Sequence, residues 1–366
     1  MPGIISPRHI QEMAYAVHEE VVNRRNPTIA DRQAYPWWSF LLKRRAERTF
    51  IGGKLIHKMQ RDGGLEEEHW DGRQVLTFQE NEVDVETTFS PRRTHIGLEL
   101  AHTEIEDLGY TVDPNMPRDK DFAKKLPKAD ADRIMDLIDM KLEDMMDAWD
   151  TRLDRTFLLD GTQKPLAPLG LAAFLPEDNT FGTFGGQPRT DPLFQHHVAL
   201  GLTYGVGGTL ERGMHQTLRD CHRNNRGSPS RVDFIMAGEA AIDRYVSFAK
   251  SNGMPYERNA GTQAASRVDI GIPDSAIHYQ NIPIVHNPTF EYLDSRGEFG
   301  GAIPWTRKML FLSSSTWTFG YAANKFKHFS APMDPADQRL TRLSLDGRHC
   351  LYCTKINGNG MVSVVD

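Results

Sequence analysis

The clearest potential for metal chemistry lies in two cysteines near the end of the chain, Cys350 and Cys353, which form a Cys-x-x-Cys pair. A tetrahedral zinc site needs four ligands, so this pair would have to recruit histidines such as His328 and His349. In a strand, however, positions 350 and 353 point to opposite faces. We therefore expect ordinary strand cysteines. With Cys221 the cysteine count is odd and low, which argues against a disulfide framework.

Histidines and carboxylates gather at a few other positions without forming a catalytic pattern. His18 is followed by two glutamates but lacks the second histidine, four residues on, that a zinc-protease helix requires. His69 follows Glu66, Glu67 and Glu68 in a polar stretch, where a solvated run of charges is the simpler interpretation. Neither group predicts a metal site.

Nucleotide and nucleophile motifs are also incomplete. The glycine-rich segment 205–208 lacks the full GxGxxG pattern, and neither GxSxG nor a Walker lysine motif occurs in the sequence. We therefore predict no catalytic residues, no cofactor, no metal ligands and no enzymatic activity. A soluble enzyme of unknown type stays open as an alternative, which a deep pocket with a perturbed carboxylate pair would favour.

The composition is that of an ordinary globular protein with one large domain or two closely joined ones. Of 366 residues, 39% are hydrophobic and 25% are charged, and the formal net charge is -6. Proteins that hold DNA by its phosphates usually carry a basic excess, so we expect no tight or sequence-specific nucleic-acid binding. The sequence shows no leader-like N-terminus and no long apolar run, so we expect neither a signal peptide nor a membrane span, and a cytosolic location.

The N-terminal third contains segments that need a partner surface. Residues 8–25 carry apolar residues at helical spacing. The apolar cluster around Trp37 and Trp38 must be buried either in its own core or against a neighbouring subunit. Residues 49–112 look extended and predict a long hairpin whose polar part is 60–93. Two-stranded ribbons are marginal alone in water, so we expect this hairpin to pack on a neighbour.

The strongest helix signal covers residues 128–160. Asp130 and Asp132 at its start complement the helix dipole, and Gly161 stands where a C-terminal glycine belongs. Such a helix spans roughly 45 Å and would act as a strut. Its apolar stripe advances by three or four residues through Ile134, Ile138, Leu142, Met145, Trp149 and Leu153.

The rest of the chain alternates strands and helices. Residues 165–190 are rich in glycine and proline, and helices are expected at about 207–225 and 238–252, separated by a strand at 231–236. Short strands and turns are expected over 266–325.

The final segment, 338–366, predicts strands joined at two hairpin-type dipeptides, Asp-Gly at 346–347 and Asn-Gly at 357–358. The predicted fold class is α+β with segregated elements.

This order of parts resembles the major capsid proteins of tailed bacteriophages, which have the Hong Kong 97-type fold. The resemblance covers nearly the whole chain, and because its motifs are short the layout carries more weight than any one of them. The stretches that are similar to the family are Gly170-Leu171 with 183–190 (glycine-rich entry to the axial domain), 234–253 (strand then helix), 279–285 (the "x-G-I-P-V-V" strand, with Asn281 where glycine is commoner) and Met309–Leu312 (the following strand).

The resemblance implies a fold with an N-terminal arm, an extended β-hairpin loop, a peripheral domain with a long spine helix, and an axial domain. The expected boundaries are 1–48 for the arm, 49–112 for the loop, 113–164 with 326–366 for the peripheral domain, and 165–325 for the axial domain. Because the arm begins almost at Met1, scaffolding is expected to be a separate protein or to be absent.

The function implied is self-assembly into hexamers and pentamers that form an icosahedral head around DNA, in the virion after assembly in the host cytoplasm. The implied partners are other copies and scaffolding, portal and decoration proteins, with no membrane. A nanocompartment shell protein of the same fold stays open. The candidate assembly-interface residues are Trp37, Trp38, Glu66, Glu67, Glu68, Trp70, Arg92 and Arg93.

Overall fold

The contacts within the chain form two compact units. Unit 1 consists of Met1–Thr28, Arg93–Leu153 and Tyr321–His349, and unit 2 of Ile29–Arg92, Asp154–Gly320 and Cys350–Asp366. The computed structural model describes residues 4–5, 10, 12–14, 34–50, 53–60, 84–109, 111–112, 128–204, 208–224, 231–253, 277–299, 301–323, 325–333 and 339–365.

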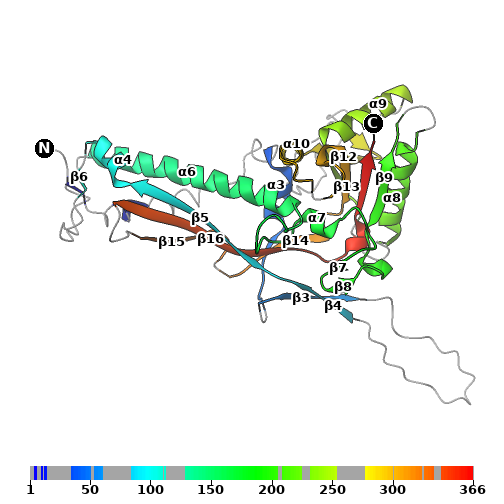
Figure 1. Ribbon diagram of the computed structural model, residues 1–366, viewed down its shortest axis with the longest axis horizontal. Coiled ribbons are helices and arrows are strands. Elements are labelled where there is room, and N and C mark those ends of the chain that lie inside the picture. The colour runs from blue at the N-terminus through cyan, green and yellow to red at the C-terminus, as the bar shows by residue number, and fades with distance from the viewer. Residues whose placement is uncertain are drawn as a thin grey trace, which may run out of the picture. The chain divides into compact units, whose positions relative to one another are not determined.

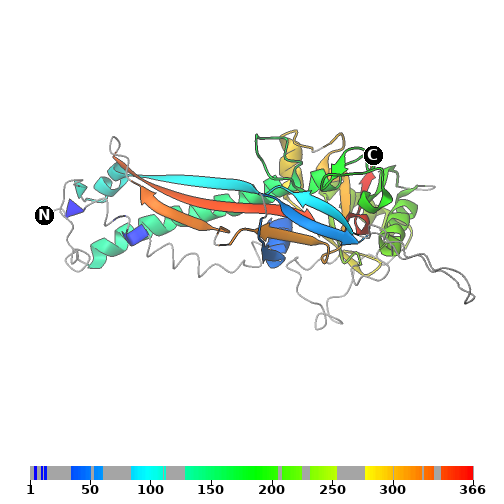
Figure 2. The same ribbon diagram turned by 90° about the horizontal axis from the view of Figure 1, so that it is seen from below.

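Unit 1 is a long helix packed along three strands. The strands β5 (Arg92–Ala101), β16 (Leu340–Cys353) and β15 (His328–Met333) lie side by side along α6 (Lys128–Leu158), as Figure 2 shows. β15 and β16 are antiparallel, with His328 opposite Asp346. The predicted helix is confirmed, and all six residues of its apolar stripe are at most 3% exposed. The helix therefore exists because its apolar face is covered by the sheet.

Two shorter elements of unit 1 correct the prediction that 49–112 is extended throughout. Residues His102–Asp107 form helix α4, because His102 and Ile105 are the buried pair, at helical and not at strand spacing. Beyond it, β6 (Thr111–Val112) pairs in parallel with β1 (Ile4–Ile5). The helix predicted for 8–25 lies mostly outside the described residues, although Ile10 and Ala14 are buried.

The turn predicted at 346–347 is wrong, because β16 runs unbroken through Gly347. A Cβ atom at this position would lie 2.9 Å from the Phe326 carbonyl oxygen and 2.9 Å from the Trp149 ring. The glycine therefore marks a close approach inside a strand, not a reversal of the chain.

Unit 2 is organised around a six-stranded mixed sheet in the order β11-β12-β10-β13-β17-β9. Its strands are β9 (His197–Leu202), β10 (Phe234–Ala237), β11 (His278–Tyr279), β12 (Ile282–His286), β13 (Lys308–Leu312) and β17 (Gly360–Val364). β17 pairs with β13 and β9 and not with β16, so a hairpin at 357–358 is also wrong. That dipeptide lies instead in the 3-10 turn η4 (Ile356–Gly358).

Two helices cover one face of this sheet, α8 (Leu210–Asn224) and α9 (Glu239–Ser251), as Figure 1 shows. Both helices and the strand between them were predicted from the sequence. Their apolar sides form one core with alternate residues of the strands, including Ile235, Ile284, Phe311 and Val362. None of the described helices is long and apolar enough to cross a membrane.

The opposite face of the sheet is covered as well. Phe40 of α3 (Pro36–Lys43) packs on Phe234 with ring centroids 5.0 Å apart, and Trp37 stands edge-on to Trp317. Helix α10 (Thr289–Ser295) corrects the prediction of only strands and turns over 266–325. The remaining short elements are β2 (Arg45–Glu47), α7 (Leu171–Phe174), β7 (Thr183–Phe184), β8 (Gln187–Pro188), η1 (Pro192–Phe194), η3 (Trp305–Arg307) and β14 (Trp317–Tyr321).

Candidate assembly surface at the base of the hairpin

The described part of the predicted hairpin is a short antiparallel ribbon in unit 2. β3 (Leu55–Gln60) pairs with β4 (Asp84–Phe89), from Leu55 opposite Phe89 to Gln60 opposite Asp84. The strand that pairs with β3 therefore lies at 84–89, inside the stretch 60–93 that the sequence marks as the polar part of the hairpin. Pro91 separates β4 from β5, because proline offers no N–H to a ladder.

The base of this ribbon is fixed to the β7–β8 turn. The Thr88 N–H donates to the Gly185 carbonyl at 2.8 Å, and the Gln187 side chain donates to the Glu86 carbonyl at 2.9 Å. Gly185 has φ +56°, and a Cβ there would lie 2.7 Å from Cβ of Thr87. Only glycine allows the two backbones to approach this closely, so the turn holds one edge of the ribbon.

Aromatic rings fill the space beneath the ribbon. Phe89 contacts Phe184, Phe174 and Tyr352 with ring centroids 5.7, 5.8 and 6.1 Å apart. Phe184 also stacks on Phe194 at 6.1 Å. The rings bury one face of the ribbon within its own subunit, and such contacts add to the stabilisation from burial alone.

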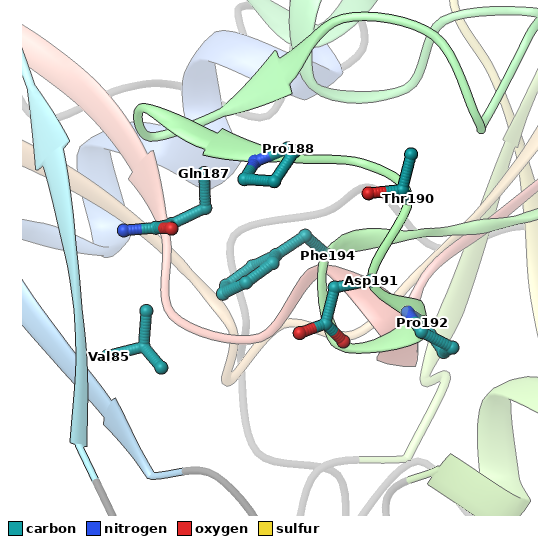
Figure 3. A pocket seen from close by; sticks show the side chains of 7 residues that line it. All are labelled: Val85, Gln187, Pro188, Thr190, Asp191, Pro192 and Phe194. Atoms are coloured by element: carbon teal, nitrogen blue, oxygen red, sulfur yellow. The ribbon is translucent and has the colours of Figure 1, made fainter. Parts of the chain in front are cut away.

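An open pocket of about 410 Å³ lies between β4 and the segment that follows β8. Figure 3 shows the ring of Phe194 among the side chains that line it, with Val85 on the hairpin side. Its lining combines apolar with polar groups: Val85, Pro188, Pro192 and Phe194, and Gln187, Thr190 and Asp191. The Asp191 carboxylate accepts the Leu193 N–H at 3.0 Å and so caps η1.

A buried arginine supports the wall of this pocket. Arg189 is 1% exposed, and its guanidinium donates to the carbonyls of Phe174 at 2.9 Å and Ala173 at 3.1 Å. Burial lowers the pKa of Arg189 to about 10. Because carbonyl oxygens take up its donors, Arg189 ties the β8 segment to α7, which fixes the position of the pocket.

The titratable groups with strongly shifted pKa values lie in the core and not in the pocket lining. Burial lowers the pKa of His196 and of His349 to about 3 and raises that of Cys353 to about 12. Burial also raises the pKa of Asp154 to about 6, against the opposing hydrogen bonds from Thr289 and the Trp38 backbone. Shifted groups that line a cleft are a mark of catalytic sites, and this pocket lacks that mark.

The Cys-x-x-Cys pair is enclosed in the protein interior. Cys350 and Cys353 are 3% and 0% exposed. Within the part of the chain that the structure describes, no three His, Cys, Asp or Glu side chains lie close enough together to hold a metal ion.

The structure places Trp37 and Trp38 in the interior of unit 2, which favours the first of the two alternatives for this cluster. They are 0% and 2% exposed. The Trp37 indole N–H donates to the Phe157 carbonyl at 3.2 Å, and the Trp38 ring stacks on Phe157 with centroids 6.1 Å apart. The two side chains therefore anchor α3 to its own subunit.

Of the charged candidate interface residues, the structure describes only the two arginines. Arg92 is half-buried and Arg93 is exposed, both at the start of β5. Glu66, Glu67, Glu68 and Trp70 lie outside the described residues. The pocket lining and the exposed Phe181, which is 80% exposed, were missed, although the glycine-rich run that shapes this surface was noted in the sequence.

No family model matches this sequence, and a search of curated proteins finds no match. Solved structures do resemble it. The capsid protein of cyanophage A-1(L) superimposes with a TM-score of 0.60 and 12% identity over 90% of this chain and 92% of that one. The SrpI encapsulin of Synechococcus elongatus superimposes with a TM-score of 0.49 and 11% identity, over 95% of this chain and 94% of that one. The capsid of Myoviridae phage XM1 superimposes with a TM-score of 0.47 and 10% identity, over 90% of this chain and 92% of that one. The first of these likenesses shows that the chain has the fold of a phage capsid protein.

Proposed function

We propose that this chain is the major capsid protein of a tailed bacteriophage, which assembles into hexamers and pentamers that form an icosahedral head around the phage DNA. The observation that carries the proposal is the likeness to the cyanophage A-1(L) capsid over nine tenths of both chains. A match over that length must take in residues from both units, and not just a common core motif.

The domain roles follow the layout of the chain. Residues 1–48 act as the N-terminal arm, 49–112 as the extended loop, 113–164 with 326–366 as the peripheral domain, and 165–325 as the axial domain. The contacts within the chain support part of this division, since they separate a helix-and-strand unit from a sheet-centred one. They differ at the end of the chain, where β17 lies inside the sheet of unit 2.

The hairpin is proposed to pack on a neighbouring subunit. Thr88 N–H and the Glu86 carbonyl point from β4 toward the β7–β8 turn, so their cross-strand partners Ile56 and Lys58 direct their backbone groups away from the ribbon on β3. Ile56 is 41% exposed. A two-stranded ribbon with an apolar side chain on its outer strand gains stability from a further surface.

The proposed role is structural, without catalysis. An acid–base site would require side chains with strongly shifted pKa values in the lining of a pocket. The side chains whose pKa values burial shifts most, such as Asp154 and His196, do not line the two described pockets. The net charge of -6 suits a shell that encloses DNA without sequence-specific contacts. Location in the virion capsid after assembly in the host cytoplasm, and scaffolding, portal and decoration proteins as partners, belong to the same proposal.

Electron microscopy of the purified protein, combined with light scattering after size exclusion, tests assembly. We expect rings or closed shells at micromolar concentration, with or without a scaffolding protein. A strictly monomeric protein at all salt concentrations contradicts the proposal. Shells isolated from cells with an enzyme inside and no DNA would identify a nanocompartment instead.

The arginines at the start of β5 offer a more local test. Because charged groups at an interface set register and orientation, Arg92→Glu with Arg93→Glu should leave the subunit folded and impair shell closure. Circular dichroism checks the fold and negative-stain microscopy the shells. Arg339→Glu, whose side chain is 79% exposed, is the matched control and should assemble normally. Normal shells from the double variant would show that the two arginines are solvated surface.

A further inference from the structure

Phe181 is the most exposed of the large hydrophobic residues in the described chain. Its side chain is 80% exposed, compared with 72% for Leu166 and 55% for Met140. An isolated exposed aliphatic residue needs no explanation, but a phenylalanine ring that is almost fully in water forgoes a large favourable burial. Aromatic side chains in such positions are typical anchors of protein–protein contacts.

The loop that carries Phe181 is braced on both sides. The Asp178 carboxylate accepts the N–H of Thr180 at 2.9 Å and its hydroxyl at 2.7 Å, which forms an Asx turn. Asn179 donates to the His196 carbonyl at 2.9 Å, and Gly182 accepts the Arg189 N–H at 3.2 Å. The backbone on both sides of Phe181 is therefore held, so little backbone freedom remains to be lost when the ring binds.

The pocket described above suits such a ring. Its wall includes Phe194, Pro188 and Pro192, which offer apolar contact, and its volume of about 410 Å³ exceeds that of one phenyl side chain. The Asp191 carboxylate on the lining can meet the positive edge of an aromatic ring. Phe181 does not fill the pocket of its own subunit, since it is not among the lining residues.

We propose that Phe181 of one copy inserts into the pocket between Val85 and Phe194 of a neighbouring copy. The inference rests on the proposed function, and it deepens that function by naming one contact between subunits. A second copy is the occupant favoured here because a shell of identical chains brings the exposed Phe181 ring of one copy near the surface of the next, and the apolar lining of the pocket suits that ring. Burial of one aromatic anchor in each subunit is repeated at every equivalent contact of a shell.

Truncation of the ring provides the first test. Phe181→Ala should leave circular dichroism and thermal unfolding of the free subunit unchanged, because the side chain is exposed. The subunit concentration needed for assembly should rise about tenfold or more, as for other buried aromatic anchors. Leu166→Ala is the matched control, since it removes a side chain of similar exposure from the same unit, and it should assemble like the wild type. Equal effects of both substitutions, or none from either, would overturn the proposal.

Cross-linking locates the contact directly. p-Benzoylphenylalanine at position 181, in assemblies mixed from ¹⁴N- and ¹⁵N-labelled subunits, should yield cross-linked peptides of mixed isotope composition that include residues 187–194. Cross-links within one subunit only, to a different segment, or to another protein would each reject the inserted ring while the shell function stands. A wild-type protein that never assembles would reject the proposed function, and the contact with it.

Discussion

The two larger sheets of the molecule differ in how many of their faces are covered. β10 and β13 in unit 2 are buried at every residue, because helices cover one face and aromatic side chains the other. In unit 1, β5 alternates, with Ile96 and Leu100 buried and His95 and Glu99 exposed. A sheet that is covered on both faces has continuous apolar strands, and one that is covered on one face has alternating ones. The comparison predicts where a substitution costs most stability.

The largest effect is expected inside the doubly covered sheet. Phe311→Ala removes a ring that is 0% exposed, and should lower the free energy of unfolding by about 3–5 kcal/mol, since the transfer and cavity contributions add. Urea unfolding of unassembled subunits measures the change. A loss below about 1 kcal/mol would mean that the sheet is less tightly packed than described.

A buried carboxyl beside the same layer should make stability depend on pH. Asp154 accepts the Thr289 hydroxyl and the Trp38 N–H, and its folded pKa is raised from 3.8 to about 6. The folded state holds this proton more tightly than the unfolded chain, so the associated stability is present below about pH 4 and lost as pH rises through 6. Asp154→Asn does not titrate.

Relative to the wild type, Asp154→Asn should therefore gain about 3 kcal/mol of stability between pH 4 and pH 7. Unfolding curves at several pH values provide the measurement. Thr289→Val, which removes a hydrogen bond to the ionised form, should move the loss of stability to still higher pH. Parallel pH profiles for the wild type and Asp154→Asn would contradict the raised pKa.

A smaller effect is expected where β16 passes the long helix of unit 1. Gly347→Ala places a methyl group 2.9 Å from both the Phe326 carbonyl oxygen and the Trp149 ring, which should cost about 1–3 kcal/mol. Gly97→Ala in β5 is the control, since the nearest atom there, on the His95 ring, lies 3.3 Å away on an exposed side chain. Thermal unfolding of the two variants should differ clearly; equal melting temperatures would show that the strand can shift to make room.

The smallest effect on stability is expected on the exposed side of β5 in unit 1. There Glu99 and Arg342 form an ion pair at 3.1 Å, with side chains 60% and 46% exposed. A double-mutant cycle to alanine should give a coupling free energy of about 0.2–1 kcal/mol that decreases with salt. A larger, salt-independent value would indicate that this face is covered in the unassembled subunit.

The elements that could be predicted are those whose signal is local and periodic. The stripe from Ile134 to Leu153 fixes one helical face, and the long helix follows from it. Both helices that cover the unit 2 sheet were found in the same way, whereas the seven-residue α10 is too short to show a periodic stripe.

The features that were missed depend on contacts between distant residues. An Asp-Gly pair in isolation favours a turn. In the folded chain, however, Gly347 is needed because the Trp149 ring, almost two hundred residues earlier in the sequence, packs directly against its backbone. In the same way, composition identifies Trp37 and Trp38 as residues to bury and cannot tell which surface buries them. Phe181 carries no sequence signal at all, because exposure is a property of the folded neighbourhood.

The place of β17 has a consequence for how the chain is made. Among the described strands, β9 pairs with β17, which lies about 160 residues later in the chain, and β13 pairs with the same strand. At ribosomal speeds of about 5–20 residues per second, β9 waits on the order of ten seconds and β13 a few seconds for this common neighbour. A chain that stops before Gly360 leaves both strand edges unpaired. The sheet of unit 2 can therefore be completed only after the ribosome has translated residues 360–364.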